Sequence, residues 1–221
     1  MREPARLVVL ISGTGRNLQA ILDAVSSGRI QARTVAVISN RPDAQGLLRA
    51  QAAGVTTEVV DHKAFESREA FDQALAERIE QYQPDLIALA GFMRILSDAF
   101  VKRFEGRMFN IHPSLLPKYR GLHTHQRALE AGDNRHGASV HYVTAELDGG
   151  PVVLQGSIDI RPGDNAEILA DRVMQEVELH IYSQVLAWAA AGRIRLTKEG
   201  LAFDGQIMDA PLQMETLTAD P

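Results

Sequence analysis

Short apolar runs alternate with helical patterns through the first half of the chain. The runs are rich in β-branched residues, as strands buried on both faces of a sheet are, and they fall at 7–11, 34–39, 57–60 and 85–90. Helical patterns lie between them, at 17–27, 44–53 and 67–83. Strands that alternate with helices of this length form βαβ units, which join their strands in parallel. The pattern predicts an α/β fold, a doubly wound and mostly parallel sheet with helices on both faces, Rossmann-like in its N-terminal half.

The second half predicts an extension of the same sheet. Strand patterns occur at 108–111, 138–144 and 152–160, and a long helical pattern runs from about 165 to 191. That helix is expected to pack on the sheet through its apolar residues, which are Ile168, Val173, Ile181, Val185 and Trp188.

No linker rich in Pro, Ser and Gly separates the two halves. We therefore expect one domain over 1–205, with a Rossmann-like half at about 1–104 and a second half at about 105–205. Residues 206–221 lack sustained periodicity and are expected to form a loosely ordered tail.

Composition narrows the possible partners. Lys and Arg number 23 and Asp and Glu 28, so the net charge is −5, which disfavours non-specific binding to nucleic acid or to an anionic membrane. The chain has no Cys, which excludes disulfides, thiolate metal sites and a cysteine nucleophile. The first apolar run is too short for a signal peptide and no stretch is long enough to span a membrane, so we expect a cytoplasmic protein that acts on small molecules.

A glycine turn follows the first strand directly. Gly13 and Gly15 permit a tight turn, and the helix that follows offers free N–H groups to an anion. The segment is not a Walker loop, and Leu18 stands where a dinucleotide fingerprint has its third glycine. A single phosphate therefore fits better than a pyrophosphate, with Arg16 and Asn17 as further donors; the alternative is a βα turn that binds nothing.

The end of the strand at 108–111 carries the most informative polar residues. Alternation along a strand places Asn110 and His112 on one face, with Ile111 directed into the core. An amide can stabilise an oxyanion and an imidazole can move a proton near neutral pH. Asp148 starts a Gly-rich turn, and a carboxylate near His112 would favour the protonated imidazole. From spacing alone, His112 can equally be a structural residue and Asp148 an ordinary turn residue.

Several motifs in order resemble the folate-dependent formyltransferase family, over about residues 7–188. They are the glycine turn Ser12-Gly13-x-Gly15-x-Asn17, the segment Gly91-Phe92-Met93-Arg94-Ile95-Leu96, Asn110-x-His112-Pro113-Ser114, and Asp148-Gly149-Gly150-Pro151. The resemblance implies a transferase of purine synthesis that moves the formyl group of 10-formyltetrahydrofolate directly to the amine of a glycinamide ribonucleotide. It implies no metal, and a monomer or weak homodimer.

The resemblance also implies roles for individual residues. Asn110, His112 and Asp148 would be catalytic, as oxyanion donor, acid and the carboxylate that supports the acid. The ribonucleotide would be held by Gly15, Arg16, Asn17 and Glu178, although Arg16 stands where relatives commonly carry a small hydroxyl residue. The folate would be held by Arg68, Met93, Arg94, Ile95, Leu96, Asn110 and Thr144.

Three other functions share some of these features. A formyltetrahydrofolate deformylase has the same Asn, His and Asp but an additional N-terminal regulatory domain, whereas here the first strand pattern begins at residue 7. A methionyl-tRNA formyltransferase shares the Asn-x-His motif but needs a tRNA-binding domain and a basic surface. A non-catalytic phosphate-binding module would explain the glycine turn and leave the catalytic residues as coincidence.

Overall fold

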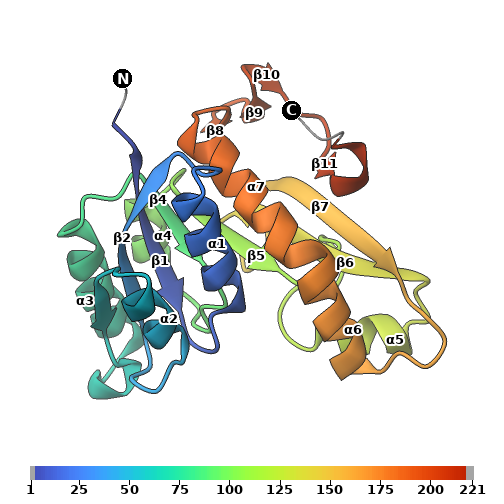
Figure 1. Ribbon diagram of the computed structural model, residues 1–221, viewed down its shortest axis with the longest axis horizontal. Coiled ribbons are helices and arrows are strands. Elements are labelled where there is room, and N and C mark those ends of the chain that lie inside the picture. Colours follow the sequence, from blue (N-terminus) through green and yellow to red (C-terminus); the bar gives the residue numbers. More distant parts are fainter. Residues whose placement is uncertain (1–2, 218–221) are drawn as a thin grey trace.

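A central sheet of eight strands organises the computed structural model, which describes residues 3–217 (Figure 1). The strand order is β11-β7-β6-β5-β4-β1-β2-β3. The strands are β1 (Ala5–Ile11), β2 (Ala32–Ser39), β3 (Thr57–Val59), β4 (Leu86–Leu89), β5 (Met108–His112), β6 (Arg135–Tyr142), β7 (Val152–Asp159) and β11 (Leu212–Gln213). From β3 to β5 all neighbours pair in parallel, whereas β6 pairs antiparallel with both β5 and β7. The predicted doubly wound, mostly parallel sheet is confirmed.

Helices cover both faces of this sheet. One face carries α1 (Arg16–Ser26), α2 (Gly46–Ala52), α6 (Ala166–Val173) and α7 (Leu179–Ala190), and the other carries α3 (Arg68–Glu80) and α4 (Asp98–Arg103). The side chains of β1 alternate between the two cores, with Val9 on the α1 side and Val8 on the α3 side. Because successive side chains of β1 enter different cores, every position from Leu7 to Ile11 is apolar, and this part of the strand is a continuous apolar run in the sequence.

The long C-terminal helix differs from its prediction in two ways. A π-helical turn, η2 (Met174–Glu178), separates α6 from α7 and inserts a wider turn into the pattern. Ile168, expected to face the sheet, is 44% exposed, because α6 directs Leu169 and Val173 inward instead. The other expected contacts are buried as predicted, namely Val173, Ile181, Val185 and Trp188.

Several short elements escaped prediction because each buries few residues. They are the 3₁₀ turn η1 (His62–Ala64), α4, α5 (Thr124–Glu130) and a separate small sheet of β8 (Ile194–Thr197), β9 (Gly200–Phe203) and β10 (Gln206–Ile207). The tail expected from residue 206 also contains β11, which joins the main sheet, and η3 (Met214–Thr216). Met214 and Leu217 pack against the core, so a loosely ordered tail is wrong for 206–217, while 218–221 lie outside the described residues.

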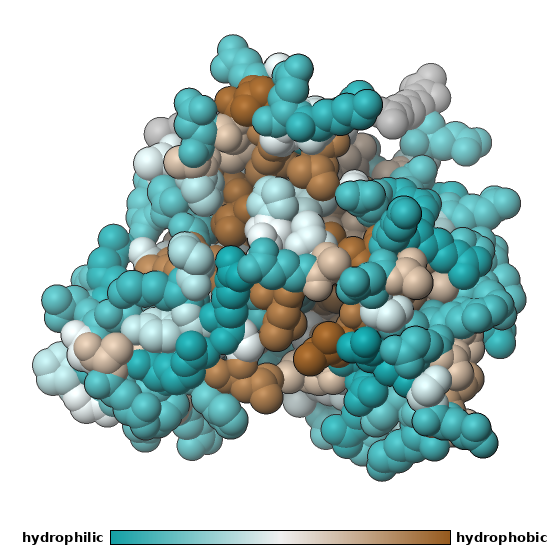
Figure 2. All heavy atoms as spheres, turned by 180° about the vertical axis from the view of Figure 1, so that it is seen from behind, coloured by the Kyte–Doolittle hydropathy of each residue, from teal (hydrophilic) through white to brown (hydrophobic). Residues whose placement is uncertain are grey.

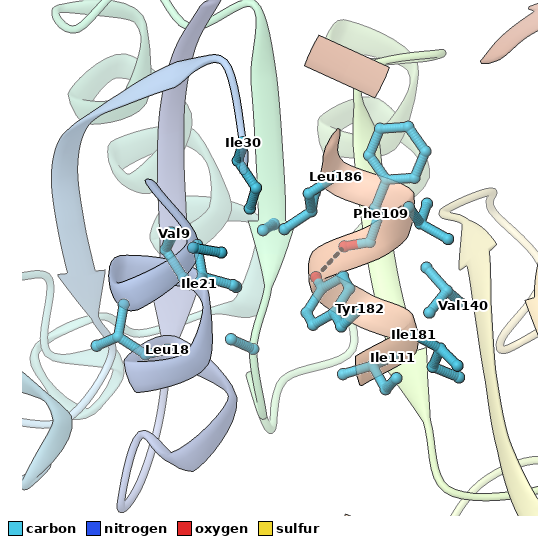
Figure 3. Packing of buried hydrophobic residues seen from close by; sticks show 14 of the residues in the cluster. Val9, Leu18, Ile21, Ile30, Phe109, Ile111, Val140, Ile181, Tyr182 and Leu186 are labelled. Carbon is cyan, nitrogen blue, oxygen red and sulfur yellow. Dashed lines mark hydrogen bonds between the residues drawn. The ribbon is translucent and has the colours of Figure 1, made fainter. Parts of the chain in front are cut away.

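Tyr182 of α7 joins the helix layer to the sheet. Its side chain is 1% exposed, and its hydroxyl lies 2.9 Å from the carbonyl oxygen of Leu89. The same hydroxyl lies 3.0 Å from the carbonyl oxygen of Phe109, as Figure 3 shows. These carbonyls belong to β4 and β5, the strands that lead to the polar residues described below. The hydroxyl therefore fixes the position of α7 over both strands.

Replacing Tyr182 with Phe is expected to lower the free energy of unfolding by about 1–2 kcal/mol, because it removes a buried donor without creating a large cavity. Denaturant unfolding with an unchanged m-value would measure the loss. An unchanged free energy of unfolding would show that the hydroxyl contributes nothing to the packing of α7.

Within the described residues, no helix combines the length and the hydrophobicity needed to cross a membrane.

Candidate active site

The polar residues singled out in the sequence meet at one edge of the sheet, where β1, β4 and β5 end. Strand β1 lies between β2 and β4 in the sheet, and the strand order reverses at β1. This edge therefore holds the topological switch point, the place at which open α/β sheets bind ligands. Seen from behind, the surface is hollowed between the two halves, and hydrophobic side chains gather there (Figure 2).

Strand β5 delivers Asn110 and His112 to this edge. Ile111 between them is 7% exposed and belongs to the core on the α7 side, so the predicted alternation is confirmed. Pairing with β6 sets His141 opposite Asn110. The amide and the imidazole therefore project from the same face of the sheet.

Asp148 reaches His112 from a separate loop. Its Oδ2 lies 3.4 Å from His112 Nδ1, and both side chains are nearly buried, at 8% and 7% exposed. The same oxygen accepts a hydrogen bond of 2.9 Å from the backbone N–H of Gly121. The structure thus brings together the two residues whose proximity their spacing in the sequence could not establish.

Gly150 allows the Asp148 loop to come this close to the sheet. A Cβ at Gly150 would lie 1.8 Å from the carbonyl oxygen of Tyr142 at the end of β6. No larger residue fits there without moving the backbone, so the second glycine after Asp148 is a packing requirement as well as a turn signal.

Both ring nitrogens of His112 face acceptors. Nε2 lies 2.9 Å from the carbonyl oxygen of Tyr119, which can only accept, and Nδ1 faces the Asp148 carboxylate. Nε2 therefore carries a proton, and the negative charge of Asp148 lies beside the other ring nitrogen.

His141 belongs to the cluster, although the sequence analysis did not select it. It is 2% exposed; its Nδ1 lies 2.9 Å from the Tyr142 carbonyl oxygen, and its Nε2 lies 3.2 Å from Asn110 Nδ2 and 3.7 Å from Asp148 Oδ1. Burial lowers the pKa of His141, which favours the neutral ring. With its proton on Nδ1, neutral His141 accepts from the Asn110 amide and orients it. The pairing of β5 with β6 places His141 opposite Asn110, and this pairing is the signal that could have identified His141 as a site residue.

The glycine turn is held by close contact with α2. Gly15 has a φ of +75°, and a Cβ there would lie 2.7 Å from the Gly46 Cα, so the position requires glycine. The turn leads into α1, where Asn17 Nδ2 donates to Glu178 Oε2 over 2.8 Å. Asn17 Oδ1 is buried and has no hydrogen-bond partner among the described residues. Arg16 forms an ion pair of 2.6 Å with Asp171 of α6.

Glu178 is a carboxylate buried in the interior, at 5% exposed. Burial raises its pKa, against smaller lowering effects of the Asn17 hydrogen bond and the nearby Arg16 charge. Because the pKa of Glu178 is higher in the folded state than in the unfolded state, its neutral carboxyl group contributes to the stability of the fold at low pH. This contribution is lost as the pH rises through the pKa of the folded state.

We expect Glu178→Gln to raise the melting temperature at pH 8 by about 2–4 °C, the effect of ~1 kcal/mol in a chain of this size, and to raise it less at pH 4. The neutral amide removes the buried charge and can still accept from Asn17. Glu176→Gln, at a side chain 42% exposed, is the matched control and should show no such gain. Equal gains at both pH values would contradict the assigned cause.

The residues expected to hold the folate divide into two groups. A pocket of about 110 Å³ at the ends of β4 and β5 is lined by five of them, which are Arg94, Ile95, Leu96, Asn110 and Thr144. Met93 is 65% exposed and lies outside this lining, as does Arg68, which pairs with Glu69 at the start of α3. His141 and Asp148 also line the pocket, so it opens directly onto the polar cluster.

An α/β fold with an amide, an imidazole and a nearly buried carboxylate at its switch point has the groups that acyl transfer uses, a donor for a developing oxyanion and groups that can move a proton. Comparison with known proteins gives the family. Residues 5–186 match the family model described as formyl transferase, and the chain belongs to this family. The resemblance stated from the motifs is thereby confirmed.

The similar proteins agree with one another. The chain is 53% identical to the phosphoribosylglycinamide formyltransferase of Escherichia coli K12 over 200 residues, covering 90% of this chain and 94% of that one. The solved structure of the Coxiella burnetii phosphoribosylglycinamide formyltransferase superposes with a TM-score of 0.90 at 50% identity, covering 96% and 99%. Glycinamide ribonucleotide transformylase 1 of Symbiobacterium toebii superposes with a TM-score of 0.88 at 44% identity, covering 92% and 95%.

Proposed function

We propose that the protein transfers the formyl group of 10-formyltetrahydrofolate to the amine of glycinamide ribonucleotide, a step of purine synthesis. The convergence of Asn110, His112 and Asp148 beside the glycine turn is the observation that carries this proposal. Its support is that the E. coli and C. burnetii relatives bear the name of this activity.

The ribonucleotide would lie along the start of α1. The backbone N–H groups at the N-terminus of α1, which begins after Gly15, would suit one phosphate. The Glu178 carboxylate and the unpartnered Asn17 Oδ1 are acceptors suited to ribose hydroxyls. Arg16 is engaged with Asp171, so it serves the phosphate only if that exposed ion pair opens.

The folate would place its pterin in the pocket beside β4 and β5. The loop residues Ile95 and Leu96 supply apolar contact, and the pocket opens toward Asn110, His141 and Asp148. A formyl group attached to the bound folate would then reach the polar cluster. Arg68 and Met93 lie outside the pocket lining and are assigned to the more exposed part of the folate.

The chemistry is acyl transfer between two nitrogens. The amine of the ribonucleotide attacks the formyl carbon, and the oxygen that becomes negative accepts a hydrogen bond from the Asn110 amide while the His112 imidazolium lies nearby. The attacking nitrogen loses one proton and the folate nitrogen gains one as the carbon–nitrogen bond to folate breaks. Asp148 assists this proton movement and stabilises the charged His112.

A spectroscopic assay of folate release, run with and without the ribonucleotide, tests the proposal. The expected result is release that requires the ribonucleotide and yields one formylated ribonucleotide for each folate released. Release that is independent of the ribonucleotide would instead indicate a hydrolase. No release would favour a binding module.

The cytoplasmic location and the monomer or weak homodimer expected from the sequence stay predictions. Cell fractionation and analytical ultracentrifugation would test them.

A further inference from the structure

The side chain of Ser12 joins the ends of three strands. Ser12 follows β1 and is 4% exposed. Its Oγ accepts a hydrogen bond of 2.8 Å from the backbone N–H of Met93, in the loop after β4. The same hydroxyl donates over 2.5 Å to Oδ1 of Asn40, which follows β2.

This hydroxyl lies between the two proposed substrate sites. On one side, Ser12 precedes the turn of Gly13 and Gly15, to which the phosphate is assigned. On the other side, Met93 precedes Arg94 to Leu96, which line the pocket assigned to the pterin. One buried side chain therefore connects the backbone segments that would hold the two substrates.

The acceptor of the Ser12 hydroxyl is itself fixed. Asn40 is 2% exposed; its side-chain Nδ2 lies 3.2 Å from His62 Nδ1, and its backbone carbonyl oxygen lies 2.9 Å from the same ring nitrogen. With its proton directed at Asn40, the Ser12 oxygen presents a lone pair to Met93. Each hydrogen bond of the hydroxyl thus has one direction, and a rotation about the Cα–Cβ bond of Ser12, which moves Oγ, would break both.

A second bond between the same segments does not depend on the side chain. The backbone N–H of Ser12 donates over 3.2 Å to the carbonyl oxygen of Gly91. Replacing Ser12 with Ala would keep this bond and remove both contacts of the hydroxyl, those with Met93 and with Asn40. The loop would stay attached to β1 but lose the contact that sets the start of the pocket segment.

We propose that Ser12 is a positioning residue that couples the two substrate sites. Its hydroxyl holds the 93–96 segment and the glycine turn in one relative placement, so a substrate bound in one site stabilises the placement that the other substrate requires. This coupling is reciprocal, because each ligand must alter the affinity of the other by the same factor. The inference rests on the proposed function.

Calorimetric titration with the ribonucleotide, in the absence and presence of saturating tetrahydrofolate, measures the coupling directly. In the unaltered protein we expect tetrahydrofolate to lower the Kd of the ribonucleotide about fivefold or more. In Ser12→Ala this ratio should fall close to one, while the ribonucleotide alone binds with nearly unchanged affinity.

Ser39→Ala is the matched control. Ser39 is fully buried at the end of β2, and among the residues that the structure describes its hydroxyl forms hydrogen bonds only with the Arg41 backbone, within its own turn. This variant also loses a buried hydroxyl, yet it should keep the ratio of the unaltered protein. A general loss of stability would lower the ratio in both variants, which would overturn the coupling role.

A ratio near one in the unaltered protein, or an unchanged ratio in Ser12→Ala, would also overturn the inference while leaving the proposed function intact. Failure of the unaltered protein to bind the ribonucleotide at all would contradict the proposed function, and the coupling with it.

Discussion

Asp148→Asn is expected to lower kcat by about 10²- to 10⁴-fold, the range that general acid–base groups contribute. The substitution keeps the size of the side chain and an oxygen that can accept from Gly121, so the loop should keep its position. It removes the negative charge that faces His112 Nδ1 over 3.4 Å and the group assigned to proton movement. The loss should therefore fall on the chemical step.

The measurement for Asp148→Asn combines steady-state kinetics with the Kd of the ribonucleotide, which should change by less than about threefold. Asp164→Asn is the control, because its side chain is 5% exposed and pairs with Arg172 but belongs to no part of the proposed site. A kcat close to that of the unaltered protein would show that the role assigned to Asp148 is wrong.

Asn110→Ala is expected to lower kcat by about 10²- to 10³-fold, or about 2.7–4 kcal/mol, the cost of losing one oxyanion donor. Nδ2 of Asn110 has two hydrogens, and neutral His141 takes one of them over 3.2 Å. The other has no partner among the residues that the structure describes, so it can meet the oxygen on which charge develops. Because the donor acts mainly in the transition state, KM should change much less than kcat.

Asn165→Ala is the comparison for Asn110→Ala. Asn165 caps α6 through its side chain, so its loss should cost about 1 kcal/mol of stability with little effect on kcat. An Asn110→Ala effect confined to KM would assign Asn110 to binding rather than to transition-state stabilisation.

The parts of the fold that bury a continuous apolar face could be predicted from the sequence. The run that forms β1 is apolar at every position because both of its faces are covered, and Phe71, Leu75 and Ile79 of α3 recur at one-turn spacing. The small sheet of β8 to β10 has no comparable face, so its pattern was too weak to identify. Ile168 was misplaced because it lies five residues before Val173 and so falls on a neighbouring face of α6, whereas Leu169, four residues before Val173, shares its buried face. The π-helical turn then changes the register of the residues that follow.

The candidate site was predictable within a strand and not between loops. Alternation along β5 was sufficient to align Asn110 and His112. Asp148 contacts His112, and Arg16 forms an ion pair with Asp171. Both contacts join segments that are far apart in the sequence, so no local spacing of residues predicts them. The role of His141 follows only from the antiparallel register of β5 and β6.

A single-turnover experiment with a labelled formyl group on the folate, with the protein in excess, tests most directly whether the two substrates react with each other in this site. The account predicts that the label reaches the ribonucleotide at the rate at which folate is released, and that none is found on the protein or as formate. Label that first accumulates on a side chain, or that leaves as formate while the ribonucleotide is bound, would contradict it.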